Sequence, residues 1–218
     1  MTVRMTEALY KLHAWLSPGY PVGAYTYSSG LETAVDSGVV RDATGTTDWV
    51  RDMLAAQGRN DAILLAAAHR AEEAGDAMAL DDLAELATAL APSAERLLET
   101  EGQGAAFADV TNAAWGGSGP APYPVAIGRA AAAHGVPLEE TLVIFLQAMA
   151  SNLVSAAIRL VPLGQTEGQR IVADLMLGIL ALAREAMQST LDDVGGCAIG
   201  ADIASMRHET LDVRLFRS

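Results

Sequence analysis

A long uncharged and strongly apolar run in the chain is TLVIFLQAMASNLVSAAI, residues 141–158. Its eighteen residues are just long enough to raise the question of a membrane span. Polar residues that would be costly in lipid interrupt it: Thr141, Gln147, Ser151, Asn152 and Ser155. We therefore expect a helix over residues 138–161 that is central and buried in protein, and no membrane span.

Helix is also the expectation for nearly all of the remaining chain, because Ala and Leu dominate and apolar residues recur at three- and four-residue spacing. Glycine, proline and capping residues place the breaks. Ser93 is a good N-cap for a long helix, Gly58 is expected to end a helix, and Asn60 to cap the next one. The expected helices cover residues 6–16, 31–37, 44–57, 63–73, 76–90, 93–115, 125–134, 138–161 and 167–189.

The run from Leu175 to Ala183 is apolar around the whole helix circumference, which predicts that this helix is central too. No strand alternation stands out. Many short helices with tight turns cannot form a long parallel bundle, so we predict an all-α protein, a single compact orthogonal bundle of about eight to ten helices. Residues 1–218 are expected to form one domain, and its tail at residues 195–218 is expected to be flexible until bound.

Composition excludes several classes of protein. The 218 residues are 51% hydrophobic, which is too apolar for a disordered chain. The net charge of −13, with Lys11 as the only lysine, argues against nucleic acid as a partner. Cys197 is the only cysteine, which excludes an internal disulfide and a multi-cysteine zinc site. A reducing compartment fits best, and the first residues lack the apolar core of a signal peptide.

The sequence carries no recognisable catalytic set. It lacks the HExxH, GxxxxGK[ST] and GxSxG patterns, and its four histidines are scattered. We therefore expect no catalytic residue, no bound cofactor and no metal site. Cys197 is expected to be an inert thiol, although His208 leaves a metal site as an alternative.

Two segments instead have the composition of protein-binding surfaces. The loop 19–27 carries Tyr20, Tyr25 and Tyr27, which suit an interface, although the loop could equally pack on its own bundle. The tail 207–217 has three arginines against one Glu and one Asp, so it is slightly cationic on an anionic chain. Its large apolar residues, Leu215 and Phe216, indicate that it packs on something, either its own body or a partner.

One face of the expected central helix is small and polar. Ala148, Asn152, Ser155 and Arg159 follow each other at spacings of four, three and four residues. We favour hydrogen bonds from this face to a neighbouring helix, with a wet cavity as the alternative.

Four segments, in order along the chain, resemble the UreF family of urease accessory proteins. They are residues 15–32 (WLSPGYPVGAYTYSSGLE), 123–128 (YPVAIG), 152–165 with Gly168 and Gln169, and 202–218 (DIASMRHETLDVRLFRS). One departure matters: Ser29 stands where the family usually has His, so no metal role is carried over to that position.

The resemblance implies an all-α cytoplasmic protein that is not an enzyme. It implies a scaffold that bridges UreD (also called UreH) and the GTPase UreG, often as a homodimer, in the complex that places nickel in apo-urease, with no nucleic acid and no membrane involved. The tail is expected to become ordered against UreD and to help form the platform for UreG. The matching residues implied in partner binding are Ser205, Met206, Arg207, His208, Glu209, Arg214, Leu215, Phe216, Arg217 and Ser218, and, from the loop, Tyr25, Tyr27, Ser28, Leu31 and Glu32.

Three alternatives stay open. Arg214 or Arg217 could act as an arginine finger toward the GTPase nucleotide, or simply pair with a partner carboxylate. The chain could be a small-molecule enzyme with a site around Asn152, Arg159 and Gln165. It could also be a nickel carrier that uses Cys197 and His208 as ligands, although these donors are too few for a closed site.

Overall fold

The computed structural model describes residues 3–117 and 119–217. Within this part of the chain every regular element is helical, so the all-α prediction is confirmed. The α-helices are α1 Val3–Trp15, α2 Leu31–Asp36, α3 Ala43–Met53, α4 Arg59–Ala74, α5 Ala77–Ala89, α6 Ala94–Trp115, α7 Tyr123–Ala133, α8 Leu138–Leu160, α9 Gln165–Asp174, α10 Met176–Gln188 and α11 Ile199–His208. Short 3₁₀ turns lie at η1 Ala24–Thr26 and η3 Leu191–Asp193.

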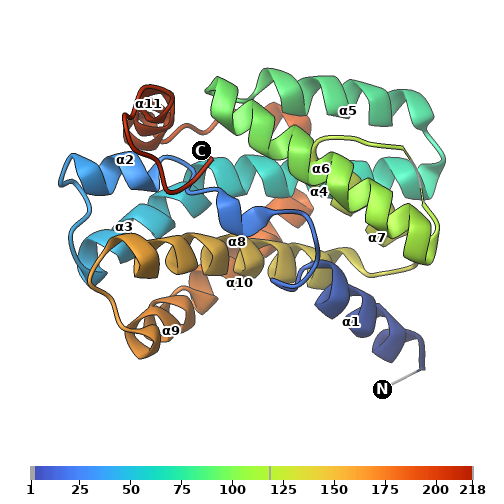
Figure 1. Cartoon of the computed structure of the whole chain (residues 1–218). Coiled ribbons are helices and arrows are strands. Elements are labelled where there is room, and N and C mark those ends of the chain that lie inside the picture. The colour runs from blue at the N-terminus through green and yellow to red at the C-terminus, as the bar shows by residue number, and fades with distance from the viewer. Residues whose placement is uncertain (1–2, 118, 218) are drawn as a thin grey trace.

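The helix that contains the uncharged run, α8, crosses the middle of the bundle (Figure 1). Leu142, Leu146, Ala150 and Ala157 form its innermost face and are fully buried. Among the described residues α8 alone is long and apolar enough to cross a membrane by length and composition, and half of its most apolar stretch is buried inside the protein. The central helix predicted from the sequence is therefore confirmed.

The expected break at Gly58 is wrong. Gly58 has helical backbone angles, and a π-helical segment, η2 Leu54–Gly58, joins α3 to α4 without interruption. Counted as one continuous helix, α3 and α4 bring the described residues to ten separate helices. A Cβ at Gly58 would lie 3.3 Å from the sulfur of Met149 on α8. This glycine therefore serves close helix packing, and Asn60 lies inside the helix instead of capping it.

The helix expected over 167–189 is also different. It is divided at Leu175 into α9 and α10, so Ile171 and Ile179 both reach the core while the chain bends around it. Met176 and Leu177 are 55% and 73% exposed, so α10 lies at the surface and is not central. Apolar residues around a whole helix did not imply burial here, because a folded protein always exposes some apolar side chains.

Helices α4 and α7 cross at close range. Gly128 of α7 lies against the backbone of Leu65 on α4, where a Cβ would stand only 2.3 Å from the Leu65 carbonyl oxygen. Leu65, Ala68 and Ala131 fill the remainder of this contact and are fully buried. The small residues of α7 therefore set how closely the two helices can approach.

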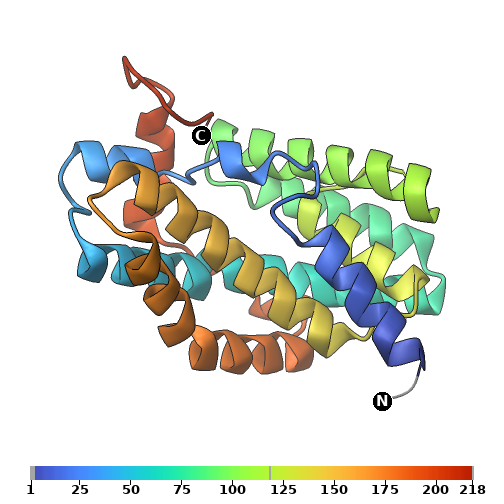
Figure 2. The same ribbon diagram turned by 60° about the horizontal axis from the view of Figure 1, so that its bottom comes forward.

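The tail lies on the body of the protein. Helix α11 packs on α2, and residues 209–217, which we call the C-terminal strap, continue beside the loop that precedes α2 (Figures 1 and 2). The backbone N–H of Arg217 donates to the carbonyl of Thr26 at 2.7 Å. The flexibility of residues 195–218 before binding stays a prediction.

Ser93 connects α6 to α11. As predicted it is the N-cap of α6, accepting a hydrogen bond from the N–H of Arg96 at 3.0 Å, and its hydroxyl also pairs with Ser205 at 2.7 Å.

Ser93→Ala should lower the free energy of unfolding by about 1 kcal/mol in urea titrations, because the cap is lost. Ser205→Ala removes only the bond between the helices and should cost less. An equal or larger loss in Ser205→Ala would contradict the capping argument.

Candidate partner-binding interface

The residues implied in partner binding divide into a buried and an exposed group. Those that lie inside the protein are Tyr27, Ser28, Leu31, Glu32, Ser205, His208 and Phe216. Those whose side chains are exposed are Tyr25, Met206, Arg207, Glu209, Arg214, Leu215 and Arg217. Ser218 lies outside the described residues. In this arrangement only the exposed group could touch another protein directly.

His208, the last residue of α11, has no exposed surface and lies between two carboxylates. Its Nε2 lies 2.9 Å from Glu32 of α2, and its Nδ1 lies 2.8 Å from Glu95 in the first turn of α6. Each ring nitrogen therefore lies within hydrogen-bond distance of a carboxylate oxygen. We call Glu32, Glu95 and His208 the clamp.

The strap is joined to the same clamp. The carboxylate of Glu32 accepts the backbone N–H of Leu215 at 2.7 Å and that of Phe216 at 3.0 Å. Arg214 donates to Glu95 at 3.2 Å. Burial alone would raise the pKa of Glu32, but the hydrogen bonds from His208 and from the two backbone N–H groups outweigh burial, and the pKa of Glu32 lies below its usual 4.5.

A second set of contacts holds the strap to the loop 19–27, which carries three tyrosines. The guanidinium of Arg159, near the end of α8, lies 4.3 Å from the centre of the Phe216 ring and donates to the carbonyl of Tyr25 at 3.0 Å. Of the three loop tyrosines, Tyr20 pairs with Thr111 and Tyr27 is buried, whereas Tyr25 is 69% exposed. The loop therefore packs on its own bundle and still presents one tyrosine to solvent.

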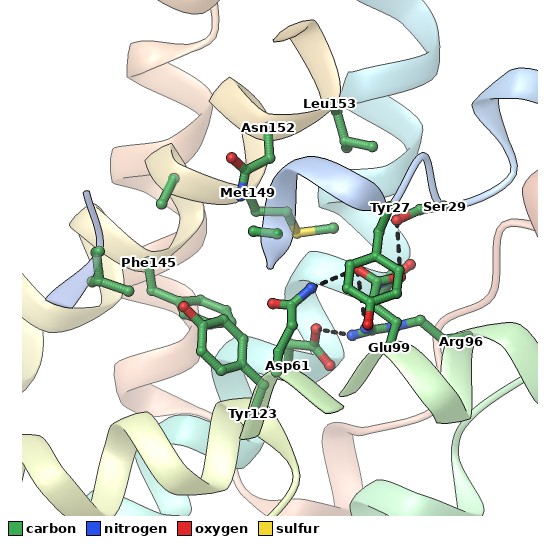
Figure 3. Close-up of a pocket in the computed structure, with 15 residues that line it drawn as sticks. Tyr27, Ser29, Asp61, Arg96, Glu99, Tyr123, Phe145, Met149, Asn152 and Leu153 are labelled. Atoms are coloured by element: carbon green, nitrogen blue, oxygen red, sulfur yellow. Dashed lines mark hydrogen bonds and ion pairs between the residues drawn. The ribbon is translucent and has the colours of Figure 1, made fainter. Parts of the chain in front are cut away.

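A cavity of about 50 Å³, lined by both charged and apolar side chains, lies beneath the loop (Figure 3). Arg96 donates to Asp61 at 2.6 Å and lies 3.6 Å from Glu99, which also accepts from Ser29 at 3.2 Å. Burial raises the pKa values of Asp61 and Glu99, and Arg96 opposes this shift only in part. The ring of Tyr27 points into the same space (Figure 3).

The small polar face of α8 borders this cavity, as the alternative interpretation placed it. Among the described residues, Arg159 is the one member of the face that hydrogen-bonds another helical element, the 3₁₀ turn η1. Ala148 and Asn152 line the cavity, and both also line an adjacent cavity of about 170 Å³, together with Ser155. Among the described residues neither Asn152 nor Ser155 has a hydrogen bond to another helix. Arg159, at the end of this face, reaches the loop and the strap.

The structure does not bring together the residues of the two alternative sites. Gln165 is exposed at the start of α9 and lines neither cavity that Asn152 lines. Cys197 is exposed at a different cavity, whereas both nitrogens of His208 face carboxylates. Within residues 3–117 and 119–217, no group of three or more His, Cys, Asp or Glu side chains is placed to hold a metal ion.

Sequence reasoning missed Glu95, Arg159 and Thr26 as contacts of the tail. Glu95 is separated from His208 by 113 residues, and nothing in its local sequence distinguishes it from other acids in a first helical turn. Only the packing of α11 beside α6 brings the two together.

Comparisons with known proteins agree on one family. A sequence model of the UreF family matches residues 40–176. A protein of Bradyrhizobium diazoefficiens named Urease accessory protein UreF is 49% identical over all of this chain and 95% of its own length. Proteins of the same name from Rhodopseudomonas palustris strain HaA2 and Cereibacter sphaeroides strain ATCC 17025 are 51% and 52% identical, over 100% and 98% of this chain and 97% and 100% of their own lengths.

Proposed function

The chain belongs to the UreF family of urease accessory proteins, and we propose that it acts in the cytoplasm as a non-catalytic scaffold. In this role it bridges UreD (UreH) and the GTPase UreG, as a homodimer, while the complex inserts nickel into apo-urease. Nickel is the cargo of the complex, and this chain holds neither nickel nor another cofactor tightly.

The observation that carries the proposal is the outer face of the tail. Met206, Val213 and Leu215 are 48%, 86% and 56% exposed, and Arg207 and Arg217 lie among them at the surface. Exposed apolar side chains beside arginines are typical of protein interfaces. The remainder of the chain is strongly anionic, so this cationic and apolar end is chemically distinct from the body that carries it.

The buried residues have a different part in this proposal. His208, Glu32, Leu31 and Ser28 lie inside the protein, so they act by holding α11 and the strap in place. The exposed residues of the strap, with Tyr25 of the neighbouring loop, then form the surface that a partner touches.

Regulation of the GTPase follows from the same contacts. A scaffold changes GTP hydrolysis only if it binds the states of the GTPase with different affinities. Arg214 is engaged by Glu95, whereas Arg217 lies at 6.0 Å from the ring centre of Tyr27 and is exposed. An arginine finger from either residue stays a prediction.

A truncation that leaves all three residues of the clamp in the chain tests the proposed function. Ending the chain after Thr210 removes the end of the strap but keeps His208 between its two carboxylates. We expect the affinity for UreD and UreG, followed by co-purification, to fall at least about 30-fold, as for the loss of a hot spot worth ~2 kcal/mol.

The far-UV circular dichroism of this truncated chain should match that of the full chain, because residues 211–217 contain no helix. A longer truncation after Ala204 would also remove His208 and would confound binding with folding. Undiminished binding of both partners by the chain ending at Thr210 would refute the proposed role of the tail.

A further inference from the structure

Three ionisable side chains are enclosed beneath the loop that precedes α2, namely Asp61 of α4 and Arg96 and Glu99 of α6 (Figure 3). We call them the buried charge cluster, since their side chains are only 10–14% exposed. Two carboxyl groups here share one guanidinium. If both were ionised, the cluster would carry one negative charge in excess.

Arg96 does not serve the two carboxyl groups equally. Its guanidinium lies 2.6 Å from the Asp61 carboxylate but 3.6 Å from that of Glu99, which is beyond the usual length of a hydrogen bond. Glu99 instead accepts from the Ser29 hydroxyl and the Gln103 amide, each at 3.2 Å, and both of these groups are neutral. Asp61 therefore has a close cation as its partner, and Glu99 does not.

The cluster lies between two cavities. Asp61, Arg96 and Glu99 all line the cavity of about 50 Å³, whose described lining includes no residue of the tail 195–218. Asp61 and Arg96 also line a larger cavity of about 290 Å³, at which Cys197 is exposed, whereas Glu99 does not. A proton can therefore reach the cluster from solvent, and the cover over Glu99 does not require an ordered tail.

The surroundings do not offset the excess charge. Among the described residues that line these two cavities, Arg96 is the only cation. The other titratable side chains that line them are Tyr27, Tyr123, Cys197 and Asp202. Burial raises the pKa of both tyrosines, so they stay neutral, and Asp202 can only add negative charge. Arg217 of the tail lies 6.0 Å from the centre of the Tyr27 ring and lines neither cavity.

Binding a proton is the ordinary way to remove such a charge. A buried carboxylate without its own cation is costly, and a glutamate in that situation can have a pKa of about 8–9. Burial raises the pKa of Glu99; Arg96 lowers it in part, and the charge of Asp61 raises it again. A protonated Glu99 also keeps its bond to Ser29, because a hydroxyl can accept as well as donate.

We propose that the buried charge cluster is a proton-binding site, which in the folded protein at neutral pH holds one proton on its two carboxyl groups. When this proton leaves, the cluster retains an unpaired buried charge, which water can solvate fully only if the bundle opens. The site therefore makes the stability of the fold depend on pH. This inference goes beyond the proposed function, because it concerns the folded chain by itself.

Infrared spectroscopy of the full chain at pH 7 tests the proposal directly, because a protonated carboxyl group has a C=O stretch separate from that of a carboxylate. The difference spectrum between wild type and Glu99→Gln should show this band in the wild type. Asp61→Asn should remove the same band, since either substitution leaves one carboxyl group to one guanidinium. Glu101→Gln, at an exposed acid of the same helix, should retain it.

The pH dependence of stability provides a second measurement. Because the pKa of Glu99 is raised on folding, the folded protein binds the proton more tightly than the unfolded chain does. Stability is therefore lost as the pH rises from the usual value of 4.5 to the raised folded value. Over that range the unfolding equilibrium constant of the wild type, divided by that of Glu99→Gln, should rise roughly tenfold for each pH unit.

Two results would overturn the inference. One is a difference spectrum at pH 7 that contains no band of a protonated carboxyl group. The other is a ratio of unfolding constants that does not change with pH above 4.5. A cation bound in place of the proton would give both results, together with a wild-type stability that rises with added K⁺ or Mg²⁺. Asp61→Asn provides the same comparisons if Glu99→Gln does not fold.

Discussion

Substituting alanine for Gly128 is expected to destabilise the protein by about 3 kcal/mol. The new Cβ would stand 2.3 Å from the carbonyl oxygen of Leu65 and 3.1 Å from the Cβ of Ala68. Both neighbours belong to the buried face of α4, so the helices must move apart and the well-packed core must open. Urea titration followed by circular dichroism should show a lower midpoint with an unchanged slope.

Gly178→Ala is the matched control. Gly178 also lies within a helix, α10, but a Cβ there meets nothing within 4 Å. Alanine should stabilise that helix by up to about 1 kcal/mol, since glycine is the poorer helix former. If Gly128→Ala is as stable as Gly178→Ala, the close approach of α4 and α7 is not what the sequence specifies.

His208→Ala should have the other large effect. The substitution leaves the carboxylates of Glu32 and Glu95 buried next to a void, without the imidazole ring that lies between them. Breaking a buried ion pair on one side costs about 3–5 kcal/mol. We expect α11 and the strap to detach, which trypsin would report as rapid cleavage after Arg207.

The cause of this effect can be tested within the clamp. If uncompensated charge is responsible, adding Glu95→Gln to His208→Ala should restore part of the resistance to trypsin. His13→Ala, at an exposed histidine of α1, should leave cleavage unchanged. Wild-type resistance in His208→Ala would show that the clamp does not hold the tail.

The sequence specified the parts of the fold that rest on local chemistry. Ser93 caps α6 as predicted, and the uncharged run became the central helix. The errors lie where packing between distant segments overrode the local signal. Gly58 suggested a helix end, yet its backbone is helical, and the absence of a side chain leaves room for Met149 of α8.

The candidate interface was predictable as a pair of segments but not as a structure. Resemblance to the family singled out both the tail and the loop before α2, and the structure places them side by side. The resemblance could not tell which residues of the two segments are buried and which are exposed, because that depends on how α11 packs on α2 and α6. The structure places Glu32 and His208 inside the protein, where Glu95 joins them from a distant helix.

A single side chain closes the strap into a ring. Glu32 hydrogen-bonds His208, which directly precedes the strap, and the backbone of Leu215 and Phe216 near the end of the strap. Residues 208–216 therefore form a loop whose two ends are held by one carboxylate. Such a closure tolerates changes of residue type among the intervening positions much better than insertions or deletions. Among relatives that retain this glutamate and histidine, the length of this segment should therefore be more constant than its composition.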